Sequence, residues 1–263
     1  AIMNGIDGGE LISPTLTFEA INQFASKTMK TNVVRVPMTK EIGIDLKTTG
    51  QMVNSKTNMV YLCNPNNPTG VVMNHKELEV FCKETSKKSI VFVDEAYHEY
   101  VMDKQYRSMV SLVNEGYDVL ISRTASKVHG LDGLRVGYAI STPKIIKRLN
   151  SYMNGSLNVV GLRGAIASYK DKRFQKFSIE KNNEGRTIVT DYLDKKGIEY
   201  LDSQTNFIFI KTGIDIKKFQ PAMEKHKVLV GRPFPPYTDW CRLSIAKPEE
   251  MESFNKGFNK ELG

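Results

Sequence analysis

The stretch "YLCNPNNPTG" at positions 61–70 places three asparagines and two prolines between an apolar run and a glycine. The run before it, "MVYLC" (59–63), is typical of a strand that is buried on both faces. Asn, Pro and Gly form turns for separate backbone reasons, so the loop has a simple explanation as a tight turn. The stretch therefore predicts a buried strand that ends in an amide-rich loop.

Similar apolar runs recur along the first part of the chain and alternate with helical patterns. A helix is predicted within 75–88 from the spacing of its apolar residues, and further helices are predicted at 143–150, 159–170 and 173–196. Apolar strands separated by helices indicate an α/β fold with a largely parallel sheet flanked by helices. The other runs read as strands are 32–36, 90–94, 118–122 and 135–140.

A second, smaller group of strands follows the long helical region. The group consists of strands near 198–201, 206–211 and 241–245, with helices between and after them. We therefore place a domain boundary near residue 175. The prediction is a large domain at 1–175 and a smaller α+β C-terminal domain at 176–263.

Composition narrows the class of protein. The chain has 263 residues, of which 40% are hydrophobic and 25% charged, an ordinary globular mixture. No apolar stretch approaches the ~20 residues needed to span a bilayer, and the N-terminus lacks the features of a signal peptide. Cys63, Cys82 and Cys241 lie far apart in the sequence, without the spacing of a metal site or a disulfide framework. We expect a cytoplasmic protein with no membrane partner and no metal.

The net charge of +8 raises the question of a nucleic-acid partner. The basic residues are scattered, however, and acids interrupt the densest group, "KDKRFQKFSIEKNNEGR". No zinc-finger, RRM or recognition-helix pattern accompanies them. The sequence therefore predicts no nucleic-acid binding and remains compatible with an anionic small molecule.

Three polar motifs each follow a predicted strand: "NPNNPTG", "DEAY" and "SRTASK". In an open α/β sheet, ligands bind at the carboxyl edge of the strands. Each motif alone has another explanation as a turn or an exposed loop. "IVFVDE" also resembles the metal-holding strand of a P-loop ATPase, but the chain lacks the G-x-x-x-x-G-K-[ST] loop that this class requires. Three motifs at one edge predict a ligand site.

With these motifs the sequence resembles the fold-type I pyridoxal-phosphate (PLP) aminotransferases of class I/II, in the histidinol-phosphate aminotransferase-like branch. The matching strings are "YLCNPNNPTG", "VFVDEAY", "SRTASKVHGLDGLRVGY" and "WCRLSIA", in the order of the family. The resemblance runs from about Gly8 to the C-terminus. It implies the PLP-transferase fold, PLP as cofactor, and a homodimer that acts on an amino acid and a 2-oxo acid. It also implies that the amides of the first string face the cofactor.

The resemblance assigns catalytic roles to Lys127, Asp94 and Tyr97, and a binding role to Asn67. Lys127 would hold the PLP aldehyde as a Schiff base and, once freed, act as general base for the substrate α-proton. Asp94 would keep the pyridine nitrogen protonated, because a nearby carboxylate favours the charged form. Tyr97 and Asn67 would hydrogen-bond the phenolic oxygen of the ring. Asn67 would also contact the substrate.

The resemblance likewise implies a phosphate site. Thr124, Ser126 and Arg135 would bind the phosphate, since a guanidinium can donate two parallel bonds to it. Gly130 and Gly133 would let the loop approach the phosphate closely.

The remaining candidate residues have different predicted roles. Phe18 would stack on the cofactor ring, or it is a core residue; both readings stay open. Arg242 matches the arginine that binds the substrate α-carboxylate, and Arg232 is a candidate for a second anion contact. His129 is expected to be a packing neighbour of the cofactor loop. Asp132 stands where the family often has a small residue, and the sequence offers no role for it.

The implied activity moves an amino group between histidinol phosphate, or an aromatic or other amino acid, and a 2-oxo acid such as 2-oxoglutarate. Two alternatives stay open: a PLP-dependent decarboxylase or C–S lyase on the same scaffold, and a truncated, non-catalytic PLP-fold protein. Family members normally carry a segment before the point where this chain begins, including a helix start that cradles the phosphate. We therefore expect the PLP-binding domain to be incomplete at its N-terminus and to bind PLP weakly.

Overall fold

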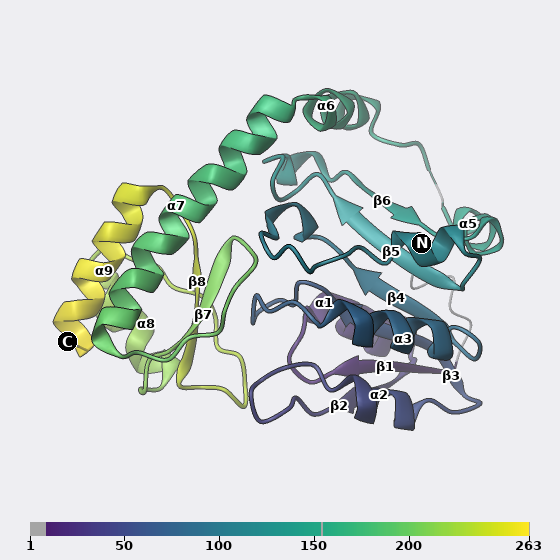
Figure 1. Ribbon diagram of the computed structural model, residues 1–263, viewed down its shortest axis with the longest axis horizontal. Coiled ribbons are helices and arrows are strands. Elements are labelled where there is room, and N and C mark those ends of the chain that lie inside the picture. The colour runs from purple at the N-terminus through teal and green to yellow at the C-terminus, as the bar shows by residue number, and fades with distance from the viewer. Residues whose placement is uncertain (1–8, 154, 263) are drawn as a thin grey trace.

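The computed structural model describes residues 9–153 and 155–262. In this part of the chain the strands form a six-stranded sheet and a separate two-stranded sheet, which Figure 1 shows beside each other. The larger sheet has the order β2-β1-β3-β4-β5-β6, in which β6 alone pairs antiparallel with its neighbour. The largely parallel sheet predicted from the sequence is confirmed. The strand bounds are β1 Glu10–Pro14, β2 Asn32–Val36, β3 Thr57–Cys63, β4 Ile90–Asp94, β5 Val119–Thr124 and β6 Gly137–Ile140.

The sequence analysis missed β1, which lies inside the sheet between β2 and β3. Only Leu11 and Ile12 are large and apolar in this strand, and both are fully buried. Glu10 precedes them and Ser13 and Pro14 follow, so the local pattern is that of a loop. Pairing with a strand on each side overrides that local pattern.

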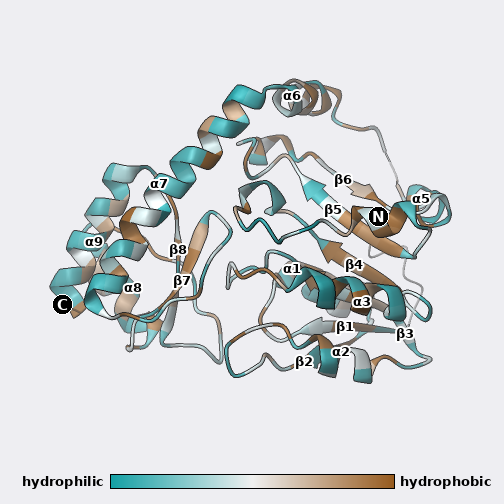
Figure 2. Cartoon of the chain, in the orientation of Figure 1, coloured by the Kyte–Doolittle hydropathy of each residue, from teal (hydrophilic) through white to brown (hydrophobic). Residues whose placement is uncertain are grey.

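Both faces of the larger sheet are covered by helices. Val60 and Leu62 pack in the same cluster as α3 His75–Thr85, whereas Tyr61 packs with α5 Pro143–Asn150 on the other face. Both alternating sets of β3 residues are therefore apolar, as a strand buried on two faces requires. Figure 2 accordingly shows β4 mostly in the hydrophobic colour. The other short elements here are α1 Glu19–Gln23, the π-helix η1 Phe24–Thr28, α2 Leu46–Met52, the 3-10 turns η2 His98–Tyr100 and η3 Asp132–Leu134, and α4 Val110–Asn114.

The smaller sheet has a hydrophobic core of its own. It pairs β7 with β8 antiparallel, and α7 and α9 pack closely against each other beside it (Figure 1). The domain boundary predicted near 175 falls inside α7, and the division of the chain into two domains stays a prediction. The bounds are α6 Val159–Lys170, α7 Lys172–Lys196, β7 Phe207–Lys211, α8 Ile216–Glu224, β8 Trp240–Ser244 and α9 Pro248–Leu262.

The strand predicted at 198–201 is wrong. This segment makes only an isolated antiparallel bridge, between Tyr200 and Ile210. Hydrogen bonds from Leu201 N to Phe209 O and from Lys211 N to Glu199 O flank the bridge. The chain then turns away into 202–206, so the pairing does not extend into a strand.

The amide-rich loop 64–70 uses its asparagines in two ways. Asn64 Oδ1 accepts a hydrogen bond from Met73 N at 2.9 Å, and Asn66 Nδ2 donates to Leu16 O and Thr69 Oγ1 at 3.0 Å. Both side chains are buried and hold the loop in shape. The expectation that all the amides face the cofactor is therefore wrong, and Asn67 is the one that reaches the cavity described below.

The same loop docks on the C-terminal part of the chain. Gly70 has a φ of +76°, and a Cβ at this position would collide with Ser203. Its carbonyl accepts a hydrogen bond from Gln204 N at 2.8 Å. The Gln204 side chain in turn accepts hydrogen bonds from Met102 N at 2.9 Å and Asp103 N at 3.2 Å. A glycine is needed at position 70 both for its backbone conformation and for this close approach.

Strand register brings the three polar motifs together. β3, β4 and β5 are neighbours in the sheet. The first motif begins just beyond the end of β3, the second at the last residue of β4, and the third at Ser122 within β5, which ends at Thr124. Cys63 pairs with Asp94, and Asp94 pairs with Ser122. Residues paired in parallel register point to the same face, so these three side chains form one row across the sheet.

Candidate active site

A cavity of about 300 Å³ lies at the carboxyl ends of β3, β4 and β5. Its walls come from the amide-rich loop, the turn after β4 and the loop after β5. All eight residues predicted to bind the cofactor line it: Phe18, Asn67, Asp94, Tyr97, Thr124, Ser126, Lys127 and Arg135. The structure thus brings residues separated by more than a hundred positions into one site.

The carboxylate of Asp94 forms part of the cavity wall. Its Oδ1 accepts a hydrogen bond from Ser122 Oγ at 2.7 Å, and its Oδ2 accepts one from Tyr61 Oη at 3.2 Å. Burial raises the pKa of the carboxyl. The hydrogen bonds from Ser122, from Tyr61 and from the backbone of Ala96 oppose that rise, and so does the charge of Lys127. A positively charged ring nitrogen would favour the ionised form further.

Lys127 and Tyr97 face the cavity from the two other loops. Lys127 Nζ lies 5.4 Å from the centroid of the Tyr97 ring. The Tyr97 ring is buried and packs edge-on against Phe207 at 5.1 Å. Burial raises the pKa of the Tyr97 phenol, so its hydroxyl stays protonated and can donate a hydrogen bond.

A chain of hydrogen bonds joins the cavity to β8. Arg242 Nη1 donates to Asn67 Oδ1 at 2.9 Å, and Asn67 Nδ2 donates to Tyr97 Oη at 3.3 Å. The Arg242 guanidinium also lies over the Phe207 ring, 5.2 Å from its centroid. Its buried Nε has no hydrogen-bond partner among residues 9–153 and 155–262. Arg242 therefore has donor capacity left for an anion.

The second predicted anion contact lies beside the first. The Arg232 guanidinium stacks on Phe234 at 4.2 Å, and Arg242 reaches the same ring at 5.7 Å. Arg232 Nη1 donates to the Pro233 carbonyl. Burial lowers the pKa of Arg242, and the neighbouring positive charge of Arg232 lowers it further. An anion between the two guanidinium groups would relieve their repulsion.

The predicted phosphate end of the cavity is organised differently from expectation. Thr124 Oγ1 donates to Ser126 Oγ at 2.9 Å and accepts from Ser126 N at 3.0 Å. Arg135, in a left-handed conformation with a φ of +55°, forms an ion pair with Asp132 at 2.6 Å. Arg135 and Ser126 hold the pKa of the Asp132 carboxyl below its usual range. Asp132, for which the sequence offered no role, is thus paired with Arg135, the residue predicted to supply the positive charge for the phosphate.

The two glycines predicted to allow a close approach differ. Gly130 has a φ of +67°, so its backbone conformation favours glycine. A Cβ at Gly130 or Gly133 would meet open space, with no described heavy atom within 4 Å. The expectation that these glycines let the loop approach a phosphate stays a prediction.

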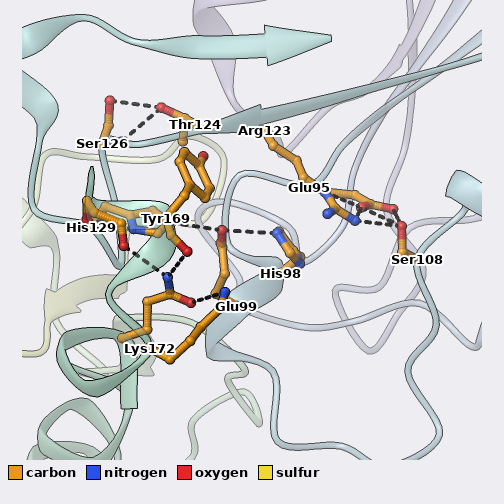
Figure 3. A network of polar contacts seen from close by, with 12 residues as sticks. Glu95, His98, Glu99, Ser108, Arg123, Thr124, Ser126, His129, Tyr169 and Lys172 are labelled. Carbon is orange, nitrogen blue, oxygen red and sulfur yellow. Dashed lines mark hydrogen bonds and ion pairs between the residues drawn. The ribbon is translucent and has the colours of Figure 1, made fainter. Parts of the chain in front are cut away.

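His129 points away from the cavity, into the network of polar contacts in Figure 3. It is buried, its ring lies 4.0 Å from that of Tyr169, and its Nδ1 lies 2.9 Å from Ser168 Oγ. Its Nε2 lies 3.6 Å from Glu99 Oε1. Burial lowers the pKa of His129, which favours the neutral ring at neutral pH. This placement agrees with the expectation that His129 packs beside the cofactor loop.

The sequence analysis did not single out four polar residues around Asp94. Arg123 pairs with the buried Glu95 at 2.8 Å, an ion pair that fixes the chain next to Asp94 (Figure 3). Tyr61 and Ser122 bind the Asp94 carboxylate itself. Ser122 begins the motif "SRTASK" and could have been found from its place at a strand end. Tyr61 lies inside an apolar run and carried no such signal.

Comparison with known proteins agrees with the fold and the site. Residues 2–256 match the family model "Aminotransferase class I and II". Histidinol-phosphate aminotransferase 2 of Hydrogenovibrio crunogenus is 33% identical over 97% of this chain and 69% of its own length. A solved structure from Erwinia carotovora atroseptica, assigned to the histidinol-phosphate aminotransferases, superposes with a TM-score of 0.93 at 32% identity, over 98% of this chain and 77% of that one.

The fold and this cavity define a PLP-type transferase, and the chain belongs to the class I and II aminotransferase family. It spans 57–69% of the lengths of the curated relatives that it matches. The solved histidinol-phosphate aminotransferase of Sinorhizobium meliloti, which contains pyridoxal 5′-phosphate, has the same fold, with a TM-score of 0.85 at 24% identity over 97% of this chain and 72% of that one.

The cofactor of the family, pyridoxal 5′-phosphate, fits the groups present in the cavity. An amine, a carboxylate set into the sheet, a protonated phenol and hydroxyls line the cavity. Arg242 is hydrogen-bonded to Asn67 in the cavity wall, and its buried Nε has no partner in the part of the chain that the structure describes. Within the described ranges, no cluster of three or more metal-ligating side chains is found. The helices described there are also too short or too polar to cross a membrane.

Proposed function

We propose that this protein is a PLP-dependent aminotransferase. It would move an amino group between histidinol phosphate, or an aromatic or other amino acid, and a 2-oxo acid such as 2-oxoglutarate. The observation that carries the proposal is the convergence of Lys127 and Asp94 on one cavity, with Arg242 hydrogen-bonded to Asn67 in its wall.

PLP, when bound, supplies an electron sink for the electrons released at the substrate α-carbon. The part of Asp94 is to keep the ring nitrogen charged, which a carboxylate favours by ~1.4 kcal/mol for each pKa unit that it shifts. Tyr97 and Asn67 would donate to the phenolic oxygen of the ring. The protonated state of the buried Tyr97 phenol supports this part.

Lys127 would move the proton at the substrate α-carbon. Its amine lies beside the Tyr97 ring, on the cavity wall, and would be free to act once the substrate amine has taken its place. Thr124, Ser126 and Arg135 would hold the phosphate. To bind the phosphate, Arg135 must break its ion pair with Asp132 or contact the carboxylate and the phosphate at the same time.

Substrate anions would bind at the guanidinium pair. Arg242 is partly buried and has a donor to spare, which suits a carboxylate that accepts two parallel bonds. Arg232 is exposed and lies over the same Phe234 ring that Arg242 reaches. It would add a second positive charge for a dicarboxylate or for a phosphorylated donor. Phe18, which is 41% exposed, would cover the cofactor ring.

The test is a transamination assay on the 263-residue chain loaded with PLP. Candidate amino donors are supplied together with 2-oxoglutarate, and glutamate formation is measured against a Lys127→Ala control. Formation of glutamate that depends on Lys127 supports the proposal. Release of carbon dioxide or of a thiol without consumption of the 2-oxo acid would instead indicate a decarboxylase or a C–S lyase. Bound PLP without any turnover would indicate a non-catalytic protein.

We also propose that the protein is a cytoplasmic homodimer. Large apolar side chains are exposed on α6 and before it, among them Leu157 (57%), Val159 (64%) and Val160 (77%). A surface of this kind is costly to leave in water and suits contact with a second copy. Light scattering on the purified protein would report the oligomeric state, and cell fractionation would report the compartment.

A further inference from the structure

Tyr61 does not line the cavity and lies one row of the sheet below Asp94, which does. It pairs with Phe92 on β4, while Cys63, two residues further along β3, pairs with Asp94. Its ring is fully buried and lies 5.2 Å from that of Phe92. A phenylalanine would fill the same space, but only a tyrosine adds a hydroxyl, and that hydroxyl donates to Asp94 Oδ2 at 3.2 Å.

We propose that Tyr61 is a positioning residue for the cofactor: its phenol fixes the Asp94 carboxylate in the orientation that meets the ring nitrogen of PLP. The inference rests on the proposed function, because it assigns Asp94 to that nitrogen. Tyr61 itself acts through Asp94 and needs no contact with the cofactor.

The carboxylate is held from both neighbouring strands. Ser122 on β5 donates to one oxygen at 2.7 Å, and Tyr61 on β3 donates to the other at 3.2 Å. The backbone of Ala96 adds a further hydrogen bond to the carboxyl group. With one side-chain donor on each oxygen, rotation of the carboxyl group costs a hydrogen bond. Asp94 at the end of β4 is thus fixed in plane before any ligand arrives, which is the preorganisation that a charged contact requires.

Both donors are neutral, which matters for the charge of the site. Burial, together with the neighbouring Cys63 and Asp94, raises the pKa of the Tyr61 phenol well above its usual value, so Tyr61 donates and never competes as an anion. A lysine or arginine in its place would hold the carboxylate equally well but would cancel its charge. Neutral donors leave the full negative charge available to a protonated ring nitrogen.

The experiment compares two cofactors in four versions of the chain. Dissociation constants are measured by equilibrium dialysis for PLP and for its carbon analogue, in which CH replaces the ring nitrogen. The ratio of the two constants reports the contact between Asp94 and the nitrogen alone. The versions are the parent chain, Tyr61→Phe, Asp94→Asn, and the double variant.

We expect Tyr61→Phe to lower the preference for PLP over the carbon analogue by about tenfold, the lower range for a hydrogen bond to a charged group. In the Asp94→Asn background the same change should leave the ratio unaltered. Equal weakening of both cofactors, or an unchanged ratio, would show that Tyr61 only packs and would overturn the inference. If the parent chain prefers neither cofactor, the contact between Asp94 and the ring nitrogen is itself absent and the inference falls; if it binds neither, the proposed function falls with it.

A matched control is available on the surface. Tyr200 Oη donates to Asp194 Oδ1 at 3.0 Å, a similar bond between a phenol and a carboxylate that lies away from the cavity. Tyr200→Phe should leave the ratio unchanged, and a change there would overturn the assignment of the effect to Tyr61. Ser122→Ala removes the shorter bond and should lower the ratio at least as much as Tyr61→Phe. An unchanged ratio in Ser122→Ala would also overturn the inference.

Discussion

Replacing Arg242 with lysine keeps the positive charge and removes the planar fork. In the structure Arg242 Nη1 donates to Asn67 Oδ1 at 2.9 Å, and its buried Nε has no partner among the described residues. A hydrogen bond from a charged donor contributes ~1.5–3 kcal/mol. A lysine at this position loses the second of two parallel bonds to a carboxylate, or the bond to Asn67, or both. Loss of one bond predicts a KM for 2-oxoglutarate about 10- to 100-fold higher.

The assay is steady-state transamination, in which KM and kcat are measured separately for the amino donor and for the 2-oxo acid. Arg232→Lys is the matched control, because Arg232 is exposed and should give a smaller rise in KM. The dissociation constant of an unreactive dicarboxylate gives the same comparison without turnover. An unchanged KM in Arg242→Lys would refute the assignment. If only donors without a carboxylate were affected, Arg242 would instead bind the phosphate of the side chain.

Three further predictions concern the cofactor and the fold. Borohydride reduction of the PLP-loaded chain should leave a stable adduct on Lys127, as peptide mass spectrometry would show; an adduct on another lysine would contradict the site. Asp132→Ala should free Arg135 and increase PLP affinity severalfold at low salt, with less effect at high salt, since an exposed pair is screened; weaker binding would mean that Asp132 supports the phosphate site. Gly70→Ala should lower the free energy of unfolding in urea by more than ~1 kcal/mol, because of its positive φ and the collision with Ser203; unchanged stability would contradict this geometry.

The sequence predicted the parts of the site that carry polar side chains at strand ends. Lys127, Asp94 and Tyr97 lie on one cavity because β4 and β5 are neighbours in a parallel sheet, a relation that follows from alternating strands and helices. The roles assigned to these residues remain predictions. The pattern of strands and helices predicted only that these residues lie together at one edge of the sheet.

The remainder depended on contacts between distant segments. Tyr61 reads as one more apolar residue, because its hydroxyl matters only through Asp94, 33 positions later. The local pattern could not separate Asn64 and Asn66 from Asn67, since all three stand in the same short loop; the family resemblance singled out Asn67, and the packing partners show what the other two do. Asp132 is the exception, because its contact with Arg135 is local, three residues apart, and is closed by the 3-10 turn between them.

The position of Gln204 has a consequence for how the molecule can move. Its backbone N–H holds the carbonyl of Gly70, and its side chain holds the backbone of Met102 and Asp103. Gly70 belongs to the loop that carries Asn67, whereas Met102 and Asp103 follow the turn that carries Tyr97. A hinge motion of the smaller sheet against the larger one must therefore either break these bonds or carry both walls of the cavity with it.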